Sequence, residues 1–312
     1  MRPGRLTIAT RGSKLALTQT EWVRGKIMAA HPEIEVDLLR IRTTGDKILD
    51  KPLAKIGGKG LFVKEIEEAL LDGRADLAVH SMKDMPADIP AGLVIGAVPV
   101  RENPGDAIIS REGVHLDAIP DGARIGTSSL RRAAQLLAHR PDLRIVPLRG
   151  NVDTRLRKLE AGDVDAIILA AAGLSRLGLS DKITQVLPAD LMLPAIGQGA
   201  LAIEMRDGDA ATSAAIRFIN DADTEVTVAA ERAFLGTIGG GCEVPVAAAA
   251  HLEGGGITLR GFVGSVDGRH SIYREGMETR QEARTLGRAI AREILEAGGK
   301  AILAEIERQS QA

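Results

Sequence analysis

The sequence is short of several residue types, and each shortage narrows what the protein can be. Its one cysteine permits neither an internal disulfide nor a Cys-x-x-Cys site, and a reducing cytoplasm is the simplest location for such a chain. Aromatic residues make up 2% of the chain, which argues against a surface that stacks nucleic-acid bases. The net charge of −2 gives no basic field for nucleic acid or membrane. No apolar run has signal-peptide form or the length of a membrane span, so we expect neither.

What remains is the composition of a folded, soluble protein. Of the 312 residues 45% are hydrophobic and 26% are charged, so two or three domains are expected. Short apolar segments alternate with amphipathic ones, which predicts α/β architecture. Linkers rich in Pro and Gly predict two lobes joined by a hinge, one over residues 1–99 with 200–219 and one over residues 105–193. Three strand-like segments and a helix predict a small α+β domain over residues 222–312.

The cysteine lies in a glycine-rich segment, residues 238–245, which reads Ile-Gly-Gly-Gly-Cys-Glu-Val-Pro. Glycines allow a positive φ and a close approach of the backbone to a ligand, so a thiol here is placed for chemistry. A free cysteine can equally fill space in a core, and the sequence leaves both readings open. If Cys242 has a chemical role, it acts as a nucleophile or as a covalent anchor.

Lys83 and Asp84 follow a predicted strand over residues 76–80. Open α/β sheets bind ligands beyond the carboxyl ends of their strands. Pro86 and Pro90 disfavour a helix after this strand, which predicts a loop. Adjacent Lys and Asp residues often form only a solvated turn, but this position makes Asp84 the best candidate for a functional carboxylate.

Arginines stand at successive predicted strand-to-helix corners. In the second lobe two arginines open a helix that Ser129 can cap. Cations favour the C-terminus of a helix, so two at its start indicate a bound carboxylate or phosphate, with a plain cap as the alternative. Their repetition at a ligand-binding edge predicts a cleft for several carboxylates. The corners carry Arg11 with the predicted helix cap Ser13, then Arg131, Arg132, Arg149, Arg155 and Arg176.

Residues 42–60 form a long connection with four lysines, two of which are Lys55 and Lys59. The Gly-Lys-Gly string within it is no Walker A motif, because no Ser or Thr follows the lysine. A connection of this length is a functional flap or a solvated loop. Phe62 opens the next predicted helix, over residues 61–71, where it packs in a core or stacks on a ligand.

Together these segments resemble the porphobilinogen deaminase (hydroxymethylbilane synthase) family of tetrapyrrole biosynthesis. The resemblance runs from Ile8 to about Pro245. It rests on Ala-Thr-Arg-Gly-Ser at 9–13, Gly-Gly-Lys-Gly-Leu-Phe at 57–62, His-Ser-Met-Lys-Asp-Met-Pro at 80–86, Gly-Thr-Ser-Ser-Leu-Arg-Arg at 126–132, Arg-Gly-Asn at 149–151, Gly-Gln-Gly at 197–199 and Gly-Gly-Cys at 240–242.

The resemblance implies two periplasmic-binding-protein-like lobes with a hinge, plus a third domain that presents the cysteine. It implies a transferase that condenses four porphobilinogen molecules head to tail with loss of ammonia. The primer is a dipyrromethane cofactor joined by a thioether to Cys242, and hydrolysis releases hydroxymethylbilane. The resemblance further implies a cytoplasmic monomer without a metal, a nucleic-acid partner or a membrane, and allows hand-over of the product to the next pathway enzyme.

The resemblance also implies roles for single residues. Asp84 is the catalytic group, which stabilises the cation left by the departing ammonia. Each porphobilinogen carries an acetate and a propionate, so linked pyrroles need many fixed cations around them. Besides Cys242, the implied cofactor contacts are Ser81, Lys83, Thr127, Ser128, Ser129, Arg131, Arg132 and Gly173. The implied substrate contacts are Arg11, Ser13, Gln19, Lys55, Lys59, Phe62, Arg149, Arg155, Arg176 and Gln198, with Lys55, Lys59 and Phe62 in the flap.

Two other functions would fit part of the same residue pattern. A non-enzymatic, two-lobed protein that binds a small dicarboxylate would explain the lobes and the arginines, but neither the cysteine segment nor the third domain. A transcriptional effector domain would need a helix-turn-helix segment or a basic face, and the sequence shows neither.

Overall fold

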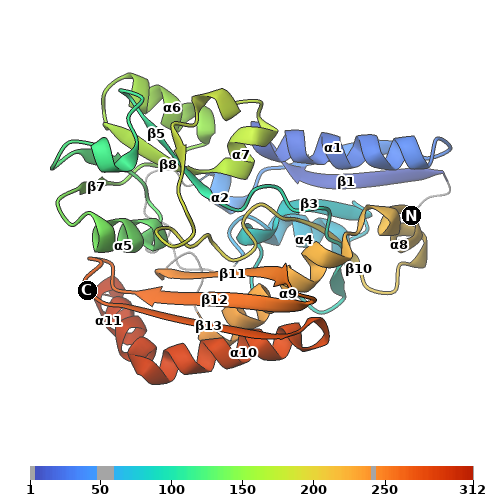
Figure 1. Ribbon diagram of the computed structural model, residues 1–312. Coiled ribbons are helices and arrows are strands. Elements are labelled where there is room, and N and C mark those ends of the chain that lie inside the picture. The colour runs from blue at the N-terminus through green and yellow to red at the C-terminus, as the bar shows by residue number, and fades with distance from the viewer. Residues whose placement is uncertain (1–3, 48–59, 240–243, 312) are drawn as a thin grey trace. The chain divides into compact units, whose positions relative to one another are not determined.

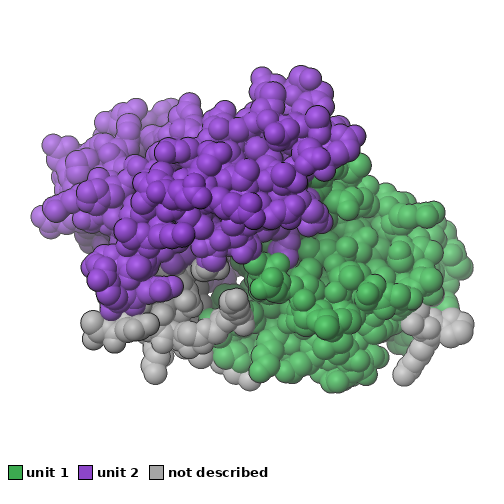
Figure 2. Space-filling view, turned by 90° about the horizontal axis from the view of Figure 1, so that it is seen from below, with its two compact units in different colours: residues 1–49, 58–102, 199–226 green, residues 50–57, 103–198, 227–312 purple. Residues whose placement is uncertain are grey.

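A computed structural model describes residues 4–47, 60–239 and 244–311, which form two compact units (Figure 2). Within these residues, unit 1 comprises 4–47, 60–102 and 199–226, and unit 2 comprises 103–198, 227–239 and 244–311. The chain therefore leaves unit 1 at residue 103 and re-enters it at residue 199. No helix among the described residues is long and apolar enough to cross a membrane.

Unit 1 is built on a mixed sheet with the strand order β2-β1-β3-β10-β4. Strands β1, β3 and β10 of this sheet are labelled in Figure 1. Strands β1, β2 and β3 are parallel, and β10 pairs antiparallel with both β3 and β4. The strands are β1 (Arg5–Arg11), β2 (Glu35–Ile41), β3 (Leu77–Ser81), β4 (Leu93–Ala97) and β10 (Leu201–Arg206). The helices of this unit are α1 (Lys14–Ala30), α2 (Thr44–Lys47), α4 (Lys64–Leu71) and α8 (Ala210–Ile216).

Alternation along β3 decides which side chains face which helix. Leu77 and Val79 belong to the core cluster that includes Val23 and Ile27 of α1. Ala78 belongs to the cluster that includes Ile66 and Leu70 of α4, on the opposite face. Since successive strand residues point to opposite faces, His80 shares the α4 face with Ala78.

Unit 2 contains a second mixed sheet of the same plan, with the order β7-β6-β8-β5-β9. Strands β6, β7 and β8 are parallel, and β5 pairs antiparallel with β8 and β9. The strands are β5 (Asp106–Ser110), β6 (Arg124–Gly126), β7 (Arg144–Val146), β8 (Ala166–Ala170) and β9 (Gln185–Val186). Three helices follow strands β6, β7 and β8: α5 (Leu130–His139), α6 (Val152–Glu160) and α7 (Ala171–Arg176).

Unit 2 also holds an antiparallel sheet of three strands, β11 (Val246–Glu253), β12 (Gly256–Gly264) and β13 (Ser271–Thr279). Helix α10 (Ala283–Ile294) contacts β12 and β13 (Figure 1). It also approaches α9 (Ala222–Ile238) closely, because a Cβ at Gly287 would lie 2.1 Å from the carbonyl oxygen of Ala230. The last helix, α11 (Lys300–Gln311), follows a break at Gly298, whose φ is 114°.

The predicted fold class, two α/β lobes and a small α+β part, is confirmed by these three sheets. Three local predictions need correction. The segment after β3 is a single 3-10 turn, η1 (Met82–Asp84), and not a loop. The helix expected from residue 61 begins at Lys64. The helix expected over residues 282–297 is followed, after a break at Gly298, by a second helix, α11, that the sequence pattern did not predict.

Candidate functional site

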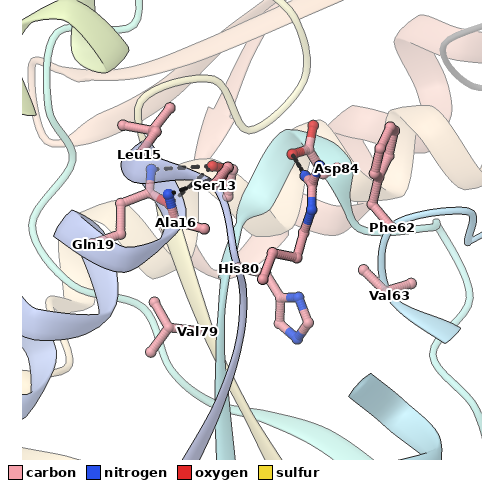
Figure 3. A pocket seen from close by; sticks show the side chains of 11 residues that line it. Ser13, Leu15, Ala16, Gln19, Phe62, Val63, Val79, His80 and Asp84 are labelled. Atoms are coloured by element: carbon pink, nitrogen blue, oxygen red, sulfur yellow. Dashed lines mark hydrogen bonds and ion pairs between the residues drawn. The ribbon is translucent and has the colours of Figure 1, made fainter. Parts of the chain in front are cut away.

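A pocket in unit 1 brings six of the predicted site residues together (Figure 3). It lies where β1 and β3 end and where α1 begins, the edge at which parallel strands of α/β sheets present ligand-binding groups. The wall also includes His80, which the sequence analysis did not assign to the site. The six are Arg11, Ser13, Gln19, Phe62, Ser81 and Asp84.

Asp84 is held at the pocket by the turn η1. The amide of Met82 donates to the carbonyl of Ala200, which lies next to β10, at 3.0 Å. The Met82 side chain is buried, and this packing helps to hold the turn in place. The carboxylate of Asp84 remains 32% exposed, with Oδ2 3.9 Å from Nη1 of Arg11. At this distance the two side chains attract each other without a hydrogen bond, which leaves the carboxylate open to a ligand.

Arg11 is fixed by two further contacts that the sequence analysis missed. Its Nε donates to Oδ1 of Asp46 at 3.2 Å, and its guanidinium lies 4.2 Å from the ring centre of Phe62. Burial disfavours the charged form of Asp46, but the hydrogen bond and charge of Arg11 outweigh it and lower the pKa of that carboxyl. Arg11 is therefore held between Asp46 and Phe62 and directed toward Asp84, so Phe62 has a contact beyond core packing.

Two polar side chains complete the pocket wall. Nε2 of Gln19 donates to Oγ of Ser81 at 3.1 Å, which joins α1 to the end of β3. Oγ of Ser13 accepts from the amide of Ala16 at 3.3 Å, so Ser13 caps α1 as predicted. Lys83 lies on η1, between the buried Met82 and Asp84.

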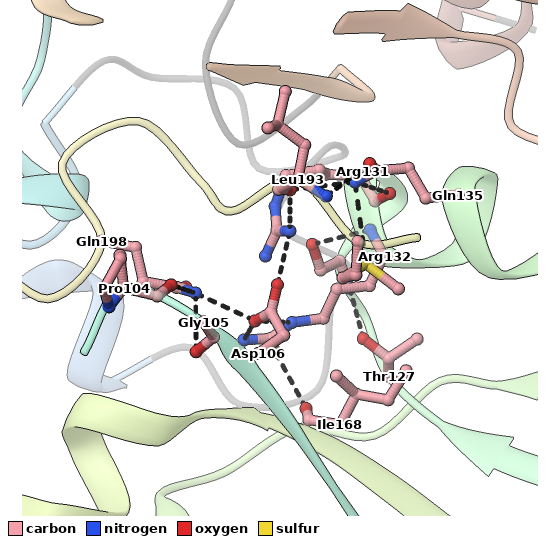
Figure 4. Close-up of polar contacts among 12 residues, drawn as sticks. Pro104, Gly105, Asp106, Thr127, Arg131, Arg132, Gln135, Ile168, Leu193 and Gln198 are labelled. Carbon is pink, nitrogen blue, oxygen red and sulfur yellow. Dashed lines mark hydrogen bonds and ion pairs between the residues drawn. The ribbon is translucent and has the colours of Figure 1, made fainter. Parts of the chain in front are cut away.

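In unit 2, the two arginines that open α5 share one buried carboxylate, Asp106 (Figure 4). Nη1 of Arg131 donates to its Oδ2 at 2.6 Å, and Nη2 of Arg132 donates to its Oδ1 at 2.7 Å. The side chains are 6%, 7% and 0% exposed for Arg131, Arg132 and Asp106. Burial opposes ionisation of Asp106, but the two guanidinium charges prevail and hold its pKa below the usual range.

Asp106 is a partner that the helix-start pattern does not reveal. Two arginines at a helix start indicate a bound carboxylate or phosphate, and in the structure one carboxylate beside them belongs to the protein itself. The sequence contains a signal for this carboxylate, since an aspartate opens the buried strand β5 and needs a cationic partner. A role of Arg131 and Arg132 in holding a ligand is still a proposal.

The hydroxyl groups of Thr127 and Ser129, just before α5, accept hydrogen bonds from backbone amides of the protein itself. Oγ of Ser129 accepts from the amide of Arg132 at 3.4 Å and caps the helix, as predicted. Oγ1 of Thr127 accepts from the amide of Ser129 at 3.1 Å, and Thr127 is buried. Ser128 between them is exposed. Gly173 is buried in the short helix α7.

A group of arginines lies at the corners of unit 2. Burial, followed by the charges of Arg132 and Arg149, lowers the pKa of Arg155 to about 10. Nη1 of Arg149 is buried and finds no hydrogen-bond partner within the described residues. Arg176, the third predicted corner, ends α7 and is half-buried. Mutual repulsion and an unsatisfied donor are the features expected of a site that awaits an anionic ligand.

Gln198, which is predicted to contact substrate, is buried and hydrogen-bonded to other groups of the protein. It is 1% exposed, and its Nε2 donates to the carbonyl of Pro104 at 2.7 Å and to Oδ1 of Asp106 at 3.0 Å. The side-chain amide thus links the two segments by which the chain leaves and re-enters unit 1.

Three predicted site residues, Cys242, Lys55 and Lys59, lie outside the described residues. No group of three or more His, Cys, Asp or Glu side chains in the described part of the chain could hold a metal ion.

Comparisons with solved structures find binding proteins at low identity. The periplasmic aliphatic sulphonate binding protein of Escherichia coli is 17% identical, with a TM-score of 0.42 over 74% of this chain and 70% of that one. A methionine binding protein is 15% identical, with a TM-score of 0.43 over 69% of this chain and 89% of that one.

Sequence relatives are far closer. Porphobilinogen deaminases of Trichlorobacter lovleyi and Brevibacillus brevis are 53% and 52% identical, over 98% and 99% of this chain and equal shares of their own lengths. The sequence model described as "Porphobilinogen deaminase, dipyromethane cofactor binding domain" matches residues 6–214, and that described as "Porphobilinogen deaminase, C-terminal domain" matches residues 226–296. The chain belongs to the porphobilinogen deaminase family.

Proposed function

We propose that this chain is the transferase that its family membership implies. It condenses four porphobilinogen molecules head to tail, with loss of ammonia, onto a dipyrromethane primer and releases hydroxymethylbilane by hydrolysis. The observation that carries the proposal is the unit 1 pocket, in which an accessible Asp84 faces Arg11 at 3.9 Å beside Ser13, Gln19 and Ser81. The cofactor is attached through a thioether to Cys242.

The described residues fit the acidic cofactor that the family domain binds. Dipyrromethane carries acetate and propionate groups, which need fixed cations where water is excluded. The buried, unpartnered Nη1 of Arg149 and the depressed pKa of Arg155 mark a place where a carboxylate would relieve both costs. Arg131 and Arg132 each have further N–H groups, so a ligand carboxylate could join Asp106 beside them.

The bound cofactor supplies the pyrrole carbon to which the first substrate is joined. The protein's own groups act on the substrate. Asp84 presents a fixed negative charge where a cation develops as ammonia leaves, and a preorganised charge of this kind lowers the barrier directly. Arg11, held by Asp46 and Phe62, binds a substrate carboxylate and keeps the substrate against Asp84. Because Asp84 lines this pocket, its carboxylate can also accept a proton from a pyrrole N–H of the substrate.

The mass of the intact protein tests the cofactor proposal. We expect purified, active protein to be heavier than its sequence by two pyrrole units, because the thioether survives denaturation. Cys242→Ser removes that excess and abolishes turnover, since a hydroxyl is a poorer nucleophile than a thiolate. The two masses are read by electrospray spectrometry. Active wild-type protein of unmodified mass would contradict the proposal, whereas protein without the excess mass and without turnover would favour the two-lobed dicarboxylate-binding alternative.

Arg149→Leu tests the anion site in unit 2. Because the Nη1 group of Arg149 is buried and unpartnered in the described structure, its removal should cost little stability. Loss of a charged hydrogen bond to a ligand carboxylate should weaken binding by about 10- to 100-fold. Steady-state KM and cofactor loading by intact mass measure this. Arg157→Leu on the exposed side of α6 is the matched control, and an equal effect of both variants would contradict the site.

The remaining elements of the proposal concern organisation. The first lobe is residues 1–99 with 200–219, the second is residues 105–193, and residues 222–312 form the domain that carries the cofactor attachment. The lobes move about a hinge. The protein acts as a cytoplasmic monomer, without nucleic-acid or membrane partners, and hands its product to the next pathway enzyme.

A further inference from the structure

Three ionisable side chains without a role in the proposal above lie together in unit 1. They are His80 on β3, Glu204 on β10 and Glu67 on α4. Their exposed fractions are 5%, 0% and 8%. Charged side chains are rarely this buried unless each has a partner, so two carboxylates with a single imidazole require an explanation.

The strand register brings the cluster together. Ala202 of β10 lies opposite His80, so Glu204, two residues further on, projects from the same sheet face as His80. Nε2 of His80 lies 3.0 Å from Oε2 of Glu204. Helix α4 covers this face and contributes Glu67. Within the described chain, Oε1 of Glu67 and Oε1 of Glu204 are buried and make no hydrogen bond.

The charges of the cluster are coupled. Burial, followed by the charge of Glu204, raises the pKa of Glu67 to about 7, while His80 acts in the opposite direction. A buried carboxylate beside another carboxylate retains its proton, whereas the imidazole favours its loss. The other charged groups on the packed elements are engaged elsewhere or are exposed. Arg5 and Arg11 of β1 pair with Asp37 and Asp46, and Arg206 of β10 pairs with Asp76 and Asp209. On α4, Glu65 accepts from Thr44, whereas Lys64 and Glu68 are exposed. Strand β4 carries no ionisable side chain.

The cluster adjoins the pocket of the proposed reaction. His80 lines that pocket together with Arg11 and Asp84 (Figure 3). It also directly precedes Ser81, from which the turn η1 carries Asp84. A change in charge at the cluster therefore acts on the same strand end and the same pocket, through a poorly solvated interior where electrostatic interactions are strong.

We propose that Glu67, His80 and Glu204 form a buried proton-sharing cluster that positions the end of β3 and sets the electrostatic potential at Asp84. We assign all three as positioning residues. His80 forms part of the pocket wall, and Glu67 and Glu204, which do not line the pocket, act on Asp84 through His80. The effect on catalysis depends on the proposed function, whereas the proton sharing itself does not.

Protein stability as a function of pH tests the proton sharing without reference to activity. The pKa of Glu67 is raised in the folded state, so folding retains a proton that the unfolded chain has released. The stability from this proton is complete below pH 4.5, the ordinary value, and is lost as pH rises to about 7. Glu67→Gln should match the wild type at low pH and exceed it above about pH 7. Each unit by which the pKa is raised corresponds to about a tenfold change in the unfolding constant. Above about pH 7 we therefore expect the unfolding constants of the wild type and Glu67→Gln to differ by at least about tenfold.

Two further variants make the stability test specific. Glu68→Gln lies next along α4 but is exposed, so its stability profile should follow that of the wild type at every pH. Glu204→Gln removes the carboxylate charge that raises the pKa of Glu67, so the fall in stability should move to lower pH. Denaturant titrations of the holoprotein between about pH 4 and 9 measure all four proteins. A Glu67→Gln profile parallel to that of the wild type would overturn the cluster even if Glu204→Gln does not fold.

Turnover provides the second readout. We expect the wild-type kcat to show an ionisation near neutral pH that is absent in Glu67→Gln and retained in Glu68→Gln. An unchanged kcat profile in Glu67→Gln, with the stability profile altered as expected, would overturn the link to Asp84 alone. Wild-type protein that consumes no porphobilinogen would instead overturn the proposed function, and the stability profiles would still decide whether the proton is shared.

Discussion

Asp84→Asn is expected to lower kcat by about 100-fold or more, because asparagine has the same shape but cannot oppose a developing cation with a full charge. The stability should change little, since the carboxylate is 32% exposed and its approach to Arg11 is 3.9 Å. The cofactor attaches elsewhere, so its mass should persist. Steady-state kinetics and intact mass on the same preparation separate loss of chemistry from loss of cofactor.

Asp88→Asn is the control for this variant. Asp88 is exposed and lies four residues beyond Asp84, so its replacement should leave kcat unchanged. A KM that rises while kcat is retained in Asp84→Asn would show that Asp84 binds substrate without stabilising the transition state. Near-normal kcat would remove Asp84 from the mechanism.

Asp106→Asn is expected to lower the free energy of unfolding by about 3–5 kcal/mol, because it leaves two buried guanidinium groups without their carboxylate. Arg131 and Arg132 are 6% and 7% exposed, so water cannot replace the lost charge. Asp106 also accepts from Gln198, which links the two chain crossings. Denaturant titration at pH 7 measures the loss, and reduced cofactor loading should accompany it.

The pH dependence of this loss has a definite sign. The pKa of Asp106 is depressed in the folded protein, so its contribution is present above the ordinary value of 3.8 and disappears as pH falls through the folded value. The difference between wild type and Asp106→Asn should therefore shrink in acid. Asp190→Asn is the comparison: Asp190 pairs with Arg260 at the surface and is 91% exposed, so no more than about 1 kcal/mol is expected. Equal losses in the two variants would contradict the buried pairing.

Local structure followed closely from local sequence. The residues predicted to cap helices α1 and α5, namely Ser13 and Ser129, both accept a backbone N–H in the structure. A cap acts within one helical turn, so its signal lies in adjacent residues. The strands and helices of both α/β sheets were predictable for the same reason, because hydrophobic periodicity is a property of a short segment. The helix predicted over residues 282–297 stops just before the break at Gly298, and the helix α11 beyond that break was not predicted.

The candidate site was only partly predictable. Motifs at the ends of β1 and β3 indicated Arg11, Ser81 and Asp84, and the structure places all three on one pocket. Their supporting groups were missed, because Asp46 lies 35 residues from Arg11 in the chain and meets it only in the folded unit. The same reasoning assigned an external anion to Arg131 and Arg132, because a partner from β5 could not be seen in their own segment.

The sequence alone determined the family and the α/β alternation, and it predicted the residues that carry the chemistry, since each of these is encoded in contiguous motifs. Only the tertiary structure decided how buried charges are neutralised. Strand β10 enters its sheet between β3 and β4 from more than 100 residues further along the chain and brings Glu204 to His80. Strand β5 likewise brings Asp106 to the start of α5. Ion pairing in an interior of low dielectric depends on position in space, which neighbouring residues in the sequence do not specify.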